Sequence, residues 1–229
     1  MIVLAIDVGG THVKVLASGR RTPRKFESGP TLTPQQMVEG VKRLTSDWRY
    51  DTVSIGYPGL VIHGRVAAEP HNLGQGWVGF DFAKAFGRPV KTVNDAAMQA
   101  LGSYTGGRML FLGLGTGLGS AMIVDGAIEP MELAHLPYKK GRTYEDVVGV
   151  RALEKMGVKK WRKQVWDVVD ALRAALEPDY VVLGGGNAKR LKRLPKRMHL
   201  GDNANAFAGG FRLWSKPRGV RRGRRLRHP

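Results

Sequence analysis

The chain of 229 residues contains no cysteine, so it forms no disulfide and offers no thiolate ligand to a metal. It has no apolar run approaching the ~20 residues that a membrane helix requires. Its first residues, MIVLAIDVGG, have the pattern of a strand interrupted by Asp7, without the basic start or the cleavage site of a secretion signal. These absences predict a cytoplasmic protein with no membrane partner.

Acidic residues are few: 19 Asp and Glu stand against 37 Lys and Arg, which gives a formal net charge of +18. Seven of the cations fall in the last fifteen residues, which contain no acid, and we interpret 215–229 as a disordered basic tail. Three further basic clusters lie at 138–142, 158–163 and 189–197. Such a surface attracts nucleotide phosphates, polyphosphate or nucleic acid, although a merely solvated surface would have the same composition.

The order of the predicted elements indicates an α/β protein with two similar halves, each opening with a glycine-turned hairpin, at 2–17 and at 108–128. We expect residues 1–100 to form an N-terminal lobe, completed by a helix at 203–214, and residues 101–202 to form a C-terminal lobe. Such proteins commonly bind ligand between their lobes. The other expected elements are helices at 33–48, 80–87, 96–106, 143–157, 159–178 and 187–194, and strands at 52–62, 89–95 and 179–183.

Glycine turns in both halves have the character of anion-binding loops. In DVGGT (7–11) the glycines let backbone N–H groups approach a phosphate, and Asp7 supplies an oxygen ligand for Mg²⁺; an ordinary Gly-Gly hairpin is the alternative. GLGTGLGS (113–120) leads into a strand rather than a helix, which is the wrong context for a dinucleotide-binding motif. One such turn in each half suits a nucleoside triphosphate, and VVLGGGNA (181–188) adds a third turn.

Several polar side chains have the chemistry of a catalytic site. Asp95 follows Asn94 between a predicted strand and a helix, where it could accept a proton from a substrate hydroxyl or simply cap that helix. Glu132, His135 and Glu145 suit a polyol, because they accept several hydrogen bonds from hydroxyl groups. A metal pair of Glu132 with His135 is one alternative, and a surface glutamate with a histidine that is hydrogen-bonded within the fold is the other.

Together these segments resemble the ROK family of sugar kinases, within the actin-like ATPase superfamily. The resemblance extends over roughly residues 2–215 and implies two ribonuclease-H-like α/β lobes around a central cleft. It also implies phosphorylation of a hexose, with glucose preferred. The segments that carry it, in the family's order, are IDVGGTHVK (6–14), GYPGLV (56–61), NLGQGW (72–77), VNDAAMQAL (93–101), LGLGTGLGSAMIVDG (112–126), ELAHL (132–136), YEDVVGVRAL (144–153) and VVLGGG (181–186).

The resemblance implies a role for each matching residue. Asp95 would be the general base that takes the proton from the 6-hydroxyl of the sugar. The sugar would be held by Gly59, Asn94, Asp95, Glu132, His135 and Glu145. The phosphoryl donor would lie against Asp7, Gly9, Gly10, Thr11, Lys14, Gly115, Thr116, Gly117, Gly185 and Gly186, with Mg²⁺ beside Asp7.

The chain departs from many family members in lacking their cysteine-rich zinc motif, so no zinc is expected. Ala134 stands where the family's ELGH-like segment has glycine, and PYKKGRT (137–143) replaces the zinc loop before Glu145. This zinc-free form is similar to the polyphosphate-dependent glucokinases of the family, which leaves both ATP and polyphosphate open as donor. Family members are commonly homodimers, and the resemblance implies a homodimer here.

Two other functions remain open. The family includes sugar-responsive repressors, but these carry a helix-turn-helix before the kinase-like part, whereas the first strand here begins at residue 2. Specific nucleic-acid binding is therefore not expected. A catalytically idle sugar-binding protein is the second alternative, and it would be expected to lack Asp95 or one of the phosphate turns, which are all present.

Overall fold

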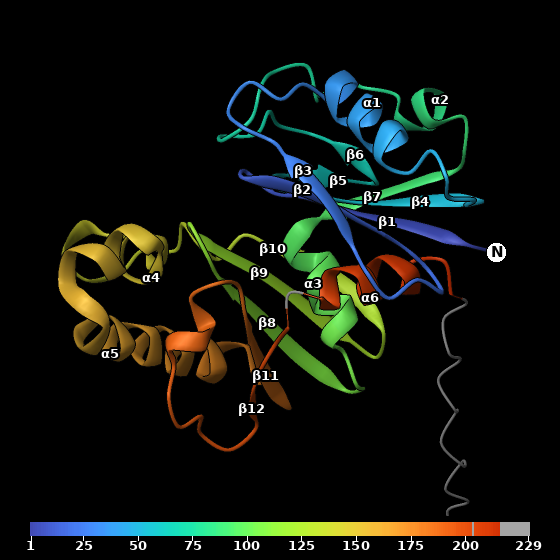
Figure 1. The fold of residues 1–229 in the computed structure, drawn as a ribbon. Helices are drawn as coiled ribbons and strands as arrows, with labels where there is room; N and C mark the ends of the chain where they lie inside the picture. Colours follow the sequence, from blue (N-terminus) through green and yellow to red (C-terminus); the bar gives the residue numbers. More distant parts are fainter. Residues whose placement is uncertain (203, 216–229) are drawn as a thin grey trace, which may run out of the picture.

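The computed structural model describes residues 1–202 and 204–215, and its main feature is a pair of five-stranded sheets with the same topology (Figure 1). The strands are β1 (Val3–Val8), β2 (His12–Ala17), β3 (Arg24–Glu27), β4 (Thr52–Tyr57), β5 (Val61–Ile62), β6 (Arg65–Val66), β7 (Val90–Asn94), β8 (Arg108–Leu114), β9 (Leu118–Val124), β10 (Ala127–Met131), β11 (Tyr180–Gly184) and β12 (Met198–Leu200). The sheet orders are β3-β2-β1-β4-β7 and β10-β9-β8-β11-β12, and β5 pairs with β6 in a small hairpin. In each large sheet an antiparallel three-strand meander is extended by two parallel strands.

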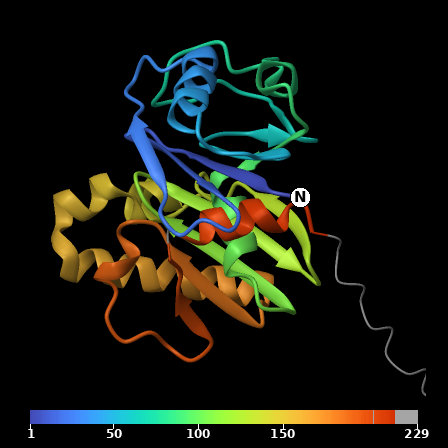
Figure 2. The same cartoon turned by 45° about the vertical axis from the view of Figure 1, so that its right-hand side comes forward.

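The helices form layers on both sides of the sheets. They are α1 (Pro34–Leu44), α2 (Phe82–Phe86), α3 (Asp95–Ser103), α4 (Tyr144–Val148), α5 (Val150–Leu176) and α6 (Asn205–Arg212), with short 3₁₀ turns η1 (Lys139–Gly141) and η2 (Ala188–Arg190). Helices α3 and α6 lie between the two sheets, α1 and α2 cover the outer face of the first sheet, and α4 and α5 cover the outer face of the second (Figures 1 and 2). None of these helices combines the length and the apolar character that crossing a membrane demands.

Burial on both faces explains why the central strands are almost continuously hydrophobic. In β8, Leu110 and Leu112 belong to the core shared with α5, while Met109 and Phe111 alternate toward α3. The helix expected at 96–106 is α3, which fills the space between the sheets. Its first residues therefore lie where both sheets can contribute to one site.

Close backbone contact joins α3 to α6. A methyl carbon added at Gly102 would collide with the carbonyl of Asn205, and one added at Gly209 would collide with the carbonyl of Met98. The helix expected at 203–214 is thus present as α6, packed on α3 and on β1 and β4 of the first sheet. The division of the chain into lobes at residue 100 stays a prediction. Of the expected tail at 215–229, all but Ser215 lies outside the described residues.

Two predicted helices differ from the structure. The helix expected at 187–194 is wrong, because only the three residues of η2 are helical there. This segment contains four lysines and arginines, so a regular helix would bring like charges close together. Pro195 follows directly and would end such a helix. The helix expected at 143–157 is interrupted at Gly149, which ends α4 and begins α5, and Gly157 kinks α5 with φ 75° and ψ 158°.

Candidate active site

The candidate site begins at the edge of the first sheet where its parallel strands end. In β1, Asp7 pairs in register with Gly56 of β4, and Gly56 pairs with Val93 of β7. The chain after β4 turns through Gly59, and β7 leads directly into Asp95. Because carboxyl ends of parallel strands share one edge, the structure brings Asp7, Gly59 and Asp95 to the same side of the sheet.

The N-terminus of α3 is seated between two glycines, one from each sheet. A side chain at Gly56 would lie 3.4 Å from Cα of Asp95, and one at Gly119 of β9 would lie 2.9 Å from Cβ of Ala96. A side chain at Gly119 would require Ala96 to move, and one at Gly56 would also displace the end of the Met98 side chain. These close approaches place Asp95 between the sheets rather than on the surface of one of them.

Asn94, not Asp95, caps α3. The Asn94 side-chain oxygen accepts hydrogen bonds from the N–H groups of Ala96 (2.9 Å) and Ala97 (3.3 Å), and its amide nitrogen donates to the carbonyl of Gly59 at 3.0 Å. The alternative that Asp95 serves as the N-cap is therefore wrong. Asp95 accepts a hydrogen bond from the Ala96 N–H at 2.8 Å, and no side chain among the described residues bonds to its carboxylate, which can accept further partners.

Two carboxylates shape the electrostatics of this edge. Burial raises the pKa of Asp95 to about 7, and the negative charge of Asp7 adds to the rise. Burial also raises the pKa of Asp7, while the Lys14 ammonium, 3.6 Å from Oδ2 of Asp7, works in the opposite direction. A carboxylate with a pKa near neutrality is suited to accept a proton at physiological pH.

The first glycine turn, Gly9 to Thr11, connects β1 and β2 beside these carboxylates. The Gly9 N–H donates to the carbonyl of His12 at 3.0 Å, and its own carbonyl accepts from the Ser28 hydroxyl at 2.7 Å. A side chain at Gly10 would meet Cβ of Asn72 at 3.4 Å. The turn is therefore held from outside by Ser28, and Asn72 lies next to it.

The second turn, Gly115 to Gly117, connects β8 and β9 and is fixed by two other segments. The Thr116 carbonyl accepts from the Val150 N–H at 3.1 Å. The Asn187 side chain donates to the Gly115 carbonyl at 3.1 Å, and Gly185, with φ +81°, approaches the Leu114 backbone where no side chain would fit. The structure thus joins the second and third glycine turns, as a shared ligand would require.

Asn187 is a residue that the sequence prediction missed. It follows the three glycines of VVLGGGNA directly, and its own N–H also donates to the Leu114 carbonyl at 3.0 Å. An asparagine after a glycine turn is an available signal, because its amide can bond to neighbouring backbone. The sequence alone does not reveal that the bonded backbone belongs to a turn about seventy residues earlier.

Glu145 links the second turn to the ELAHL segment. Its carboxylate lies against Gly117 and accepts from the Leu118 N–H at 3.2 Å, while its own N–H donates to the Ala134 carbonyl at 3.0 Å. Glu132 and His135 are exposed, and within residues 1–202 and 204–215 no hydrogen bond or ion pair connects them to Asp95. The structure therefore brings Glu145 to the second glycine turn but leaves Glu132 and His135 exposed and unconnected to Asp95 among the described residues.

The side chains available as metal ligands suit Mg²⁺ better than a metal ion bound by protein groups alone. Across the described residues, no three or more His, Cys, Asp and Glu side chains gather closely enough to hold a metal ion. Mg²⁺ usually takes one or two carboxylates together with water and substrate phosphates. Asp7, beside a glycine turn, offers that kind of partial site.

The repeated architecture and the solved structures that resemble it together identify the fold class. A repeated sheet, a glycine turn in each repeat and carboxylates at the strand ends form an α/β protein of the ribonuclease-H-like, actin-like ATPase type, and the expected fold class is confirmed. The chain belongs to the ROK family, whose family model matches residues 3–130.

Several proteins that are similar to this chain are named as glucokinases or a glucomannokinase. Polyphosphate glucokinase of Mycobacterium tuberculosis (strain H37Rv) is 29% identical over 208 residues, which cover 81% of this chain and 77% of that protein. The structure of inorganic polyphosphate/ATP-glucomannokinase from Arthrobacter sp. strain KM has a TM-score of 0.77 and 25% identity, with 91% of this chain and 96% of that one covered. A ROK family glucokinase from Streptomyces griseus, in complex with glucose and AMPPNP, has a TM-score of 0.74 and 15% identity, with 93% and 99% covered.

Proposed function

We propose that this protein is a sugar kinase that transfers a phosphoryl group to the 6-hydroxyl of a hexose, with glucose as the preferred acceptor. The observation that carries the proposal is Asp95: it begins a helix seated between two sheets, its capping role is taken by Asn94, and burial raises its pKa to about 7. The kinase names of the relatives support the same reaction.

In the proposed reaction Asp95 accepts the proton of the sugar 6-hydroxyl. The hydroxyl oxygen forms a bond to the terminal phosphorus of the donor, and the bond from that phosphorus to the leaving phosphate oxygen breaks. Asn94 supports this step by holding the first turn of α3 and the Gly59 loop together. Gly59, Glu132, His135 and Glu145 are the other groups that we assign to the sugar.

The donor phosphates lie, in this proposal, between the glycine turns of the two halves. The N–H groups of Gly10 and Thr11 in the first turn, and of Thr116 and Gly117 in the second, contact phosphate oxygens. The Gly9 and Gly115 N–H groups shape the turns instead, because they donate to the carbonyls of His12 and Gly117. Lys14 supplies a positive charge. Gly185 and Gly186 border the far end of the donor. Mg²⁺, when held near Asp7, neutralises charge on the donor phosphates.

We propose polyphosphate as a donor, with ATP as the alternative. The three basic clusters converge on α5: Arg162 donates to the Arg190 carbonyl at 2.6 Å, and Lys139 lies 3.7 Å from Asp167. The cluster at 189–197 begins four residues after Gly185, so positive charge continues outward from the third glycine turn. A long polyanion would gain from this surface, whereas a nucleotide is too short to reach most of it.

A panel of purified-protein assays tests the proposal. Glucose, mannose, fructose and an amino sugar are each combined with ATP and with polyphosphate, with and without Mg²⁺, and the sugar phosphate is measured. We expect Mg²⁺-dependent formation of glucose 6-phosphate. Sugar binding without any phosphorylation would instead identify an idle sugar-binding protein, and the absence of both would overturn the assignment.

A further inference from the structure

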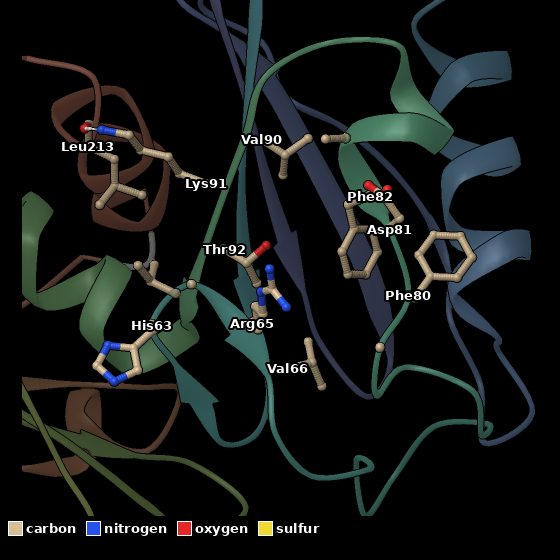
Figure 3. A pocket seen from close by; sticks show the side chains of 14 residues that line it. His63, Arg65, Val66, Phe80, Asp81, Phe82, Val90, Lys91, Thr92 and Leu213 are labelled. Carbon is tan, nitrogen blue, oxygen red and sulfur yellow. Dashed lines mark hydrogen bonds between the residues drawn. The ribbon is translucent and has the colours of Figure 1, made fainter.

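A cavity of about 770 Å³ lies apart from the residues assigned to sugar and donor. It is bounded by the β5–β6 hairpin, the segment that enters α2, and β7, and Leu213 closes one end (Figure 3). Sites for small molecules commonly have volumes of ~300–1,000 Å³, so the cavity is large enough for a metabolite. Nothing in the proposed kinase reaction uses it.

The charged groups around this cavity are mainly positive. Its cations are Arg65 and Lys91, and Asp81 is the one acid among the lining residues that the structure describes. The Asp81 carboxylate already accepts a hydrogen bond from the Lys84 N–H at 2.9 Å, and Lys91 donates to the Leu213 carbonyl at 2.7 Å. Arg65 forms no ion pair or side-chain hydrogen bond with any residue that the structure describes, so its guanidinium is available to an anion.

Neutral polar groups accompany the arginine. Thr92 is only 5% exposed, lines the cavity, and its hydroxyl has no partner within residues 1–202 and 204–215. β7 is the last strand of its sheet, so the outer edge of its backbone along Val90–Val93 has no strand partner. These groups are donors and acceptors of the kind that hydroxyl-bearing ligands need.

An apolar wall completes the cavity. Figure 3 shows Phe80 and Phe82 on one side, Arg65 and Thr92 near the middle, and Lys91 and Leu213 on the other side. Phe82 belongs to the core that also contains Trp77, so this wall is firmly supported. The cavity therefore combines a cation, hydroxyl partners and an apolar surface.

We propose that this cavity is a second binding site, for a phosphate ester of the size of a sugar phosphate. The guanidinium of Arg65 suits a phosphate oxygen pair, with Lys91 adding positive charge. Thr92 and the free edge of β7 bind hydroxyl groups, and the phenylalanine wall covers the carbon skeleton.

The site is connected to the candidate active site by a single strand. Val90 to Val93 line the cavity, and the next residues along the chain are Asn94 and Asp95. A ligand that pairs with the outer edge of β7 would restrain the strand from which α3 begins. Occupancy of the cavity would therefore act on the geometry around Asp95.

Calorimetric titration of the full chain with glucose 6-phosphate, in the presence of saturating glucose, tests the proposal. We expect glucose 6-phosphate to bind at one site even when glucose is saturating. Arg65→Ser should lower the affinity for glucose 6-phosphate at least tenfold. Arg43→Ser, which changes an exposed arginine on α1 outside the cavity, should leave that affinity unchanged. Thr92→Val, which preserves shape, should weaken binding by about fivefold. Inorganic phosphate, as a parallel probe, should bind more weakly than the ester.

The outcomes separate this site from the kinase site. If glucose 6-phosphate does not bind in the presence of saturating glucose, the second site is overturned while the kinase proposal stays intact. Equal affinity of Arg65→Ser and Arg43→Ser for glucose 6-phosphate would have the same consequence. Equal affinity for inorganic phosphate and the ester would overturn the assignment to an ester. Persistent binding in a protein that phosphorylates no sugar would retain the second site and refute the kinase proposal.

Discussion

At the scale of single residues, the chemistry depends on how little Asp95 is used for structure. Asn94 performs the capping of α3, while the Asp95 carboxylate accepts the Ala96 N–H. A carboxylate that capped the helix would accept hydrogen bonds from the helix N–H groups, which would lower its pKa and make it a weaker base. The division of work between two adjacent residues is what makes a general base possible at this position.

Replacement of this base is the first prediction. Asp95→Asn keeps the shape of the side chain but cannot take the proton, so kcat should fall by about 10²–10⁴-fold. Sugar binding, measured by calorimetry, should survive with little change. Asp170→Asn on the exposed face of α5 is the matched control, and near-normal turnover by Asp95→Asn would refute the assignment.

The pH dependence of turnover is the second prediction. Burial raises the pKa of Asp95 to about 7, so the ionised form required of a base is lost as the pH falls through 7. The value of kcat/KM should therefore fall about tenfold per pH unit below that point and level off above it. Initial rates at saturating donor between pH 5 and 9 measure this, and a flat profile from pH 5 to 8 would contradict it.

Glu145 provides the third prediction, because it bonds to the end of the second glycine turn through the Leu118 N–H. Glu145→Ala removes this bond and should lower the free energy of unfolding by about 1–3 kcal/mol and raise the KM for sugar and donor. Glu145→Gln retains an acceptor oxygen and should have a smaller effect on stability. Denaturant unfolding and steady-state kinetics measure both, and equal effects of the two changes would exclude a role for the hydrogen bond.

At the scale of elements, the position of α3 decides the site. Its first turn passes between Gly56 and Gly119, and its last turns contact α6 backbone to backbone. The helix therefore connects the two sheets with almost no side-chain spacer. Any change that pushes α3 outward would also move Asp95.

The contact between α3 and α6 gives the fourth prediction. In Gly209→Ala the methyl group meets the Met98 carbonyl, which no rotamer change relieves, so the protein should lose about 3 kcal/mol of unfolding free energy. Gly186→Ala is the control, because a methyl group there meets no atom within 4 Å. Denaturant unfolding compares the two, and equal stability would show that the helices are not so closely packed.

At the scale of the whole molecule, the net charge of +18 favours a polyanionic donor. The fifth prediction is that the KM for polyphosphate rises by roughly tenfold between 50 and 300 mM KCl, whereas that for ATP rises much less. Lys189→Gln combined with Lys192→Gln, both exposed beside the third glycine turn, should weaken this salt dependence. Parallel titrations with the two donors measure it, and identical salt responses would remove the argument for a basic donor surface.

Much of this protein could be predicted from local sequence. The glycine turns in DVGGT and GLGTGLGS, the alternation of β1 and β8, and the helix that follows Asn94 all depend on residues close together in the chain. Their physical basis is local backbone freedom and burial. The segment after Gly186 was predicted wrongly as a helix, because local propensity does not include the crowding of charge or the bond from Asn187 to Gly115.

The sequence by itself determined the fold class, the two glycine turns and the position of Asp95 between a strand and a helix. Only the tertiary structure decided that Asn94 takes the cap, that Asn187 and Glu145 hold the second turn, and that Glu132 and His135 remain exposed. It also decided where the cavity beside β7 lies. The reason is that turns and strands follow from neighbours in the chain, whereas the pKa of Asp95 and the contacts between turns depend on groups brought together by packing.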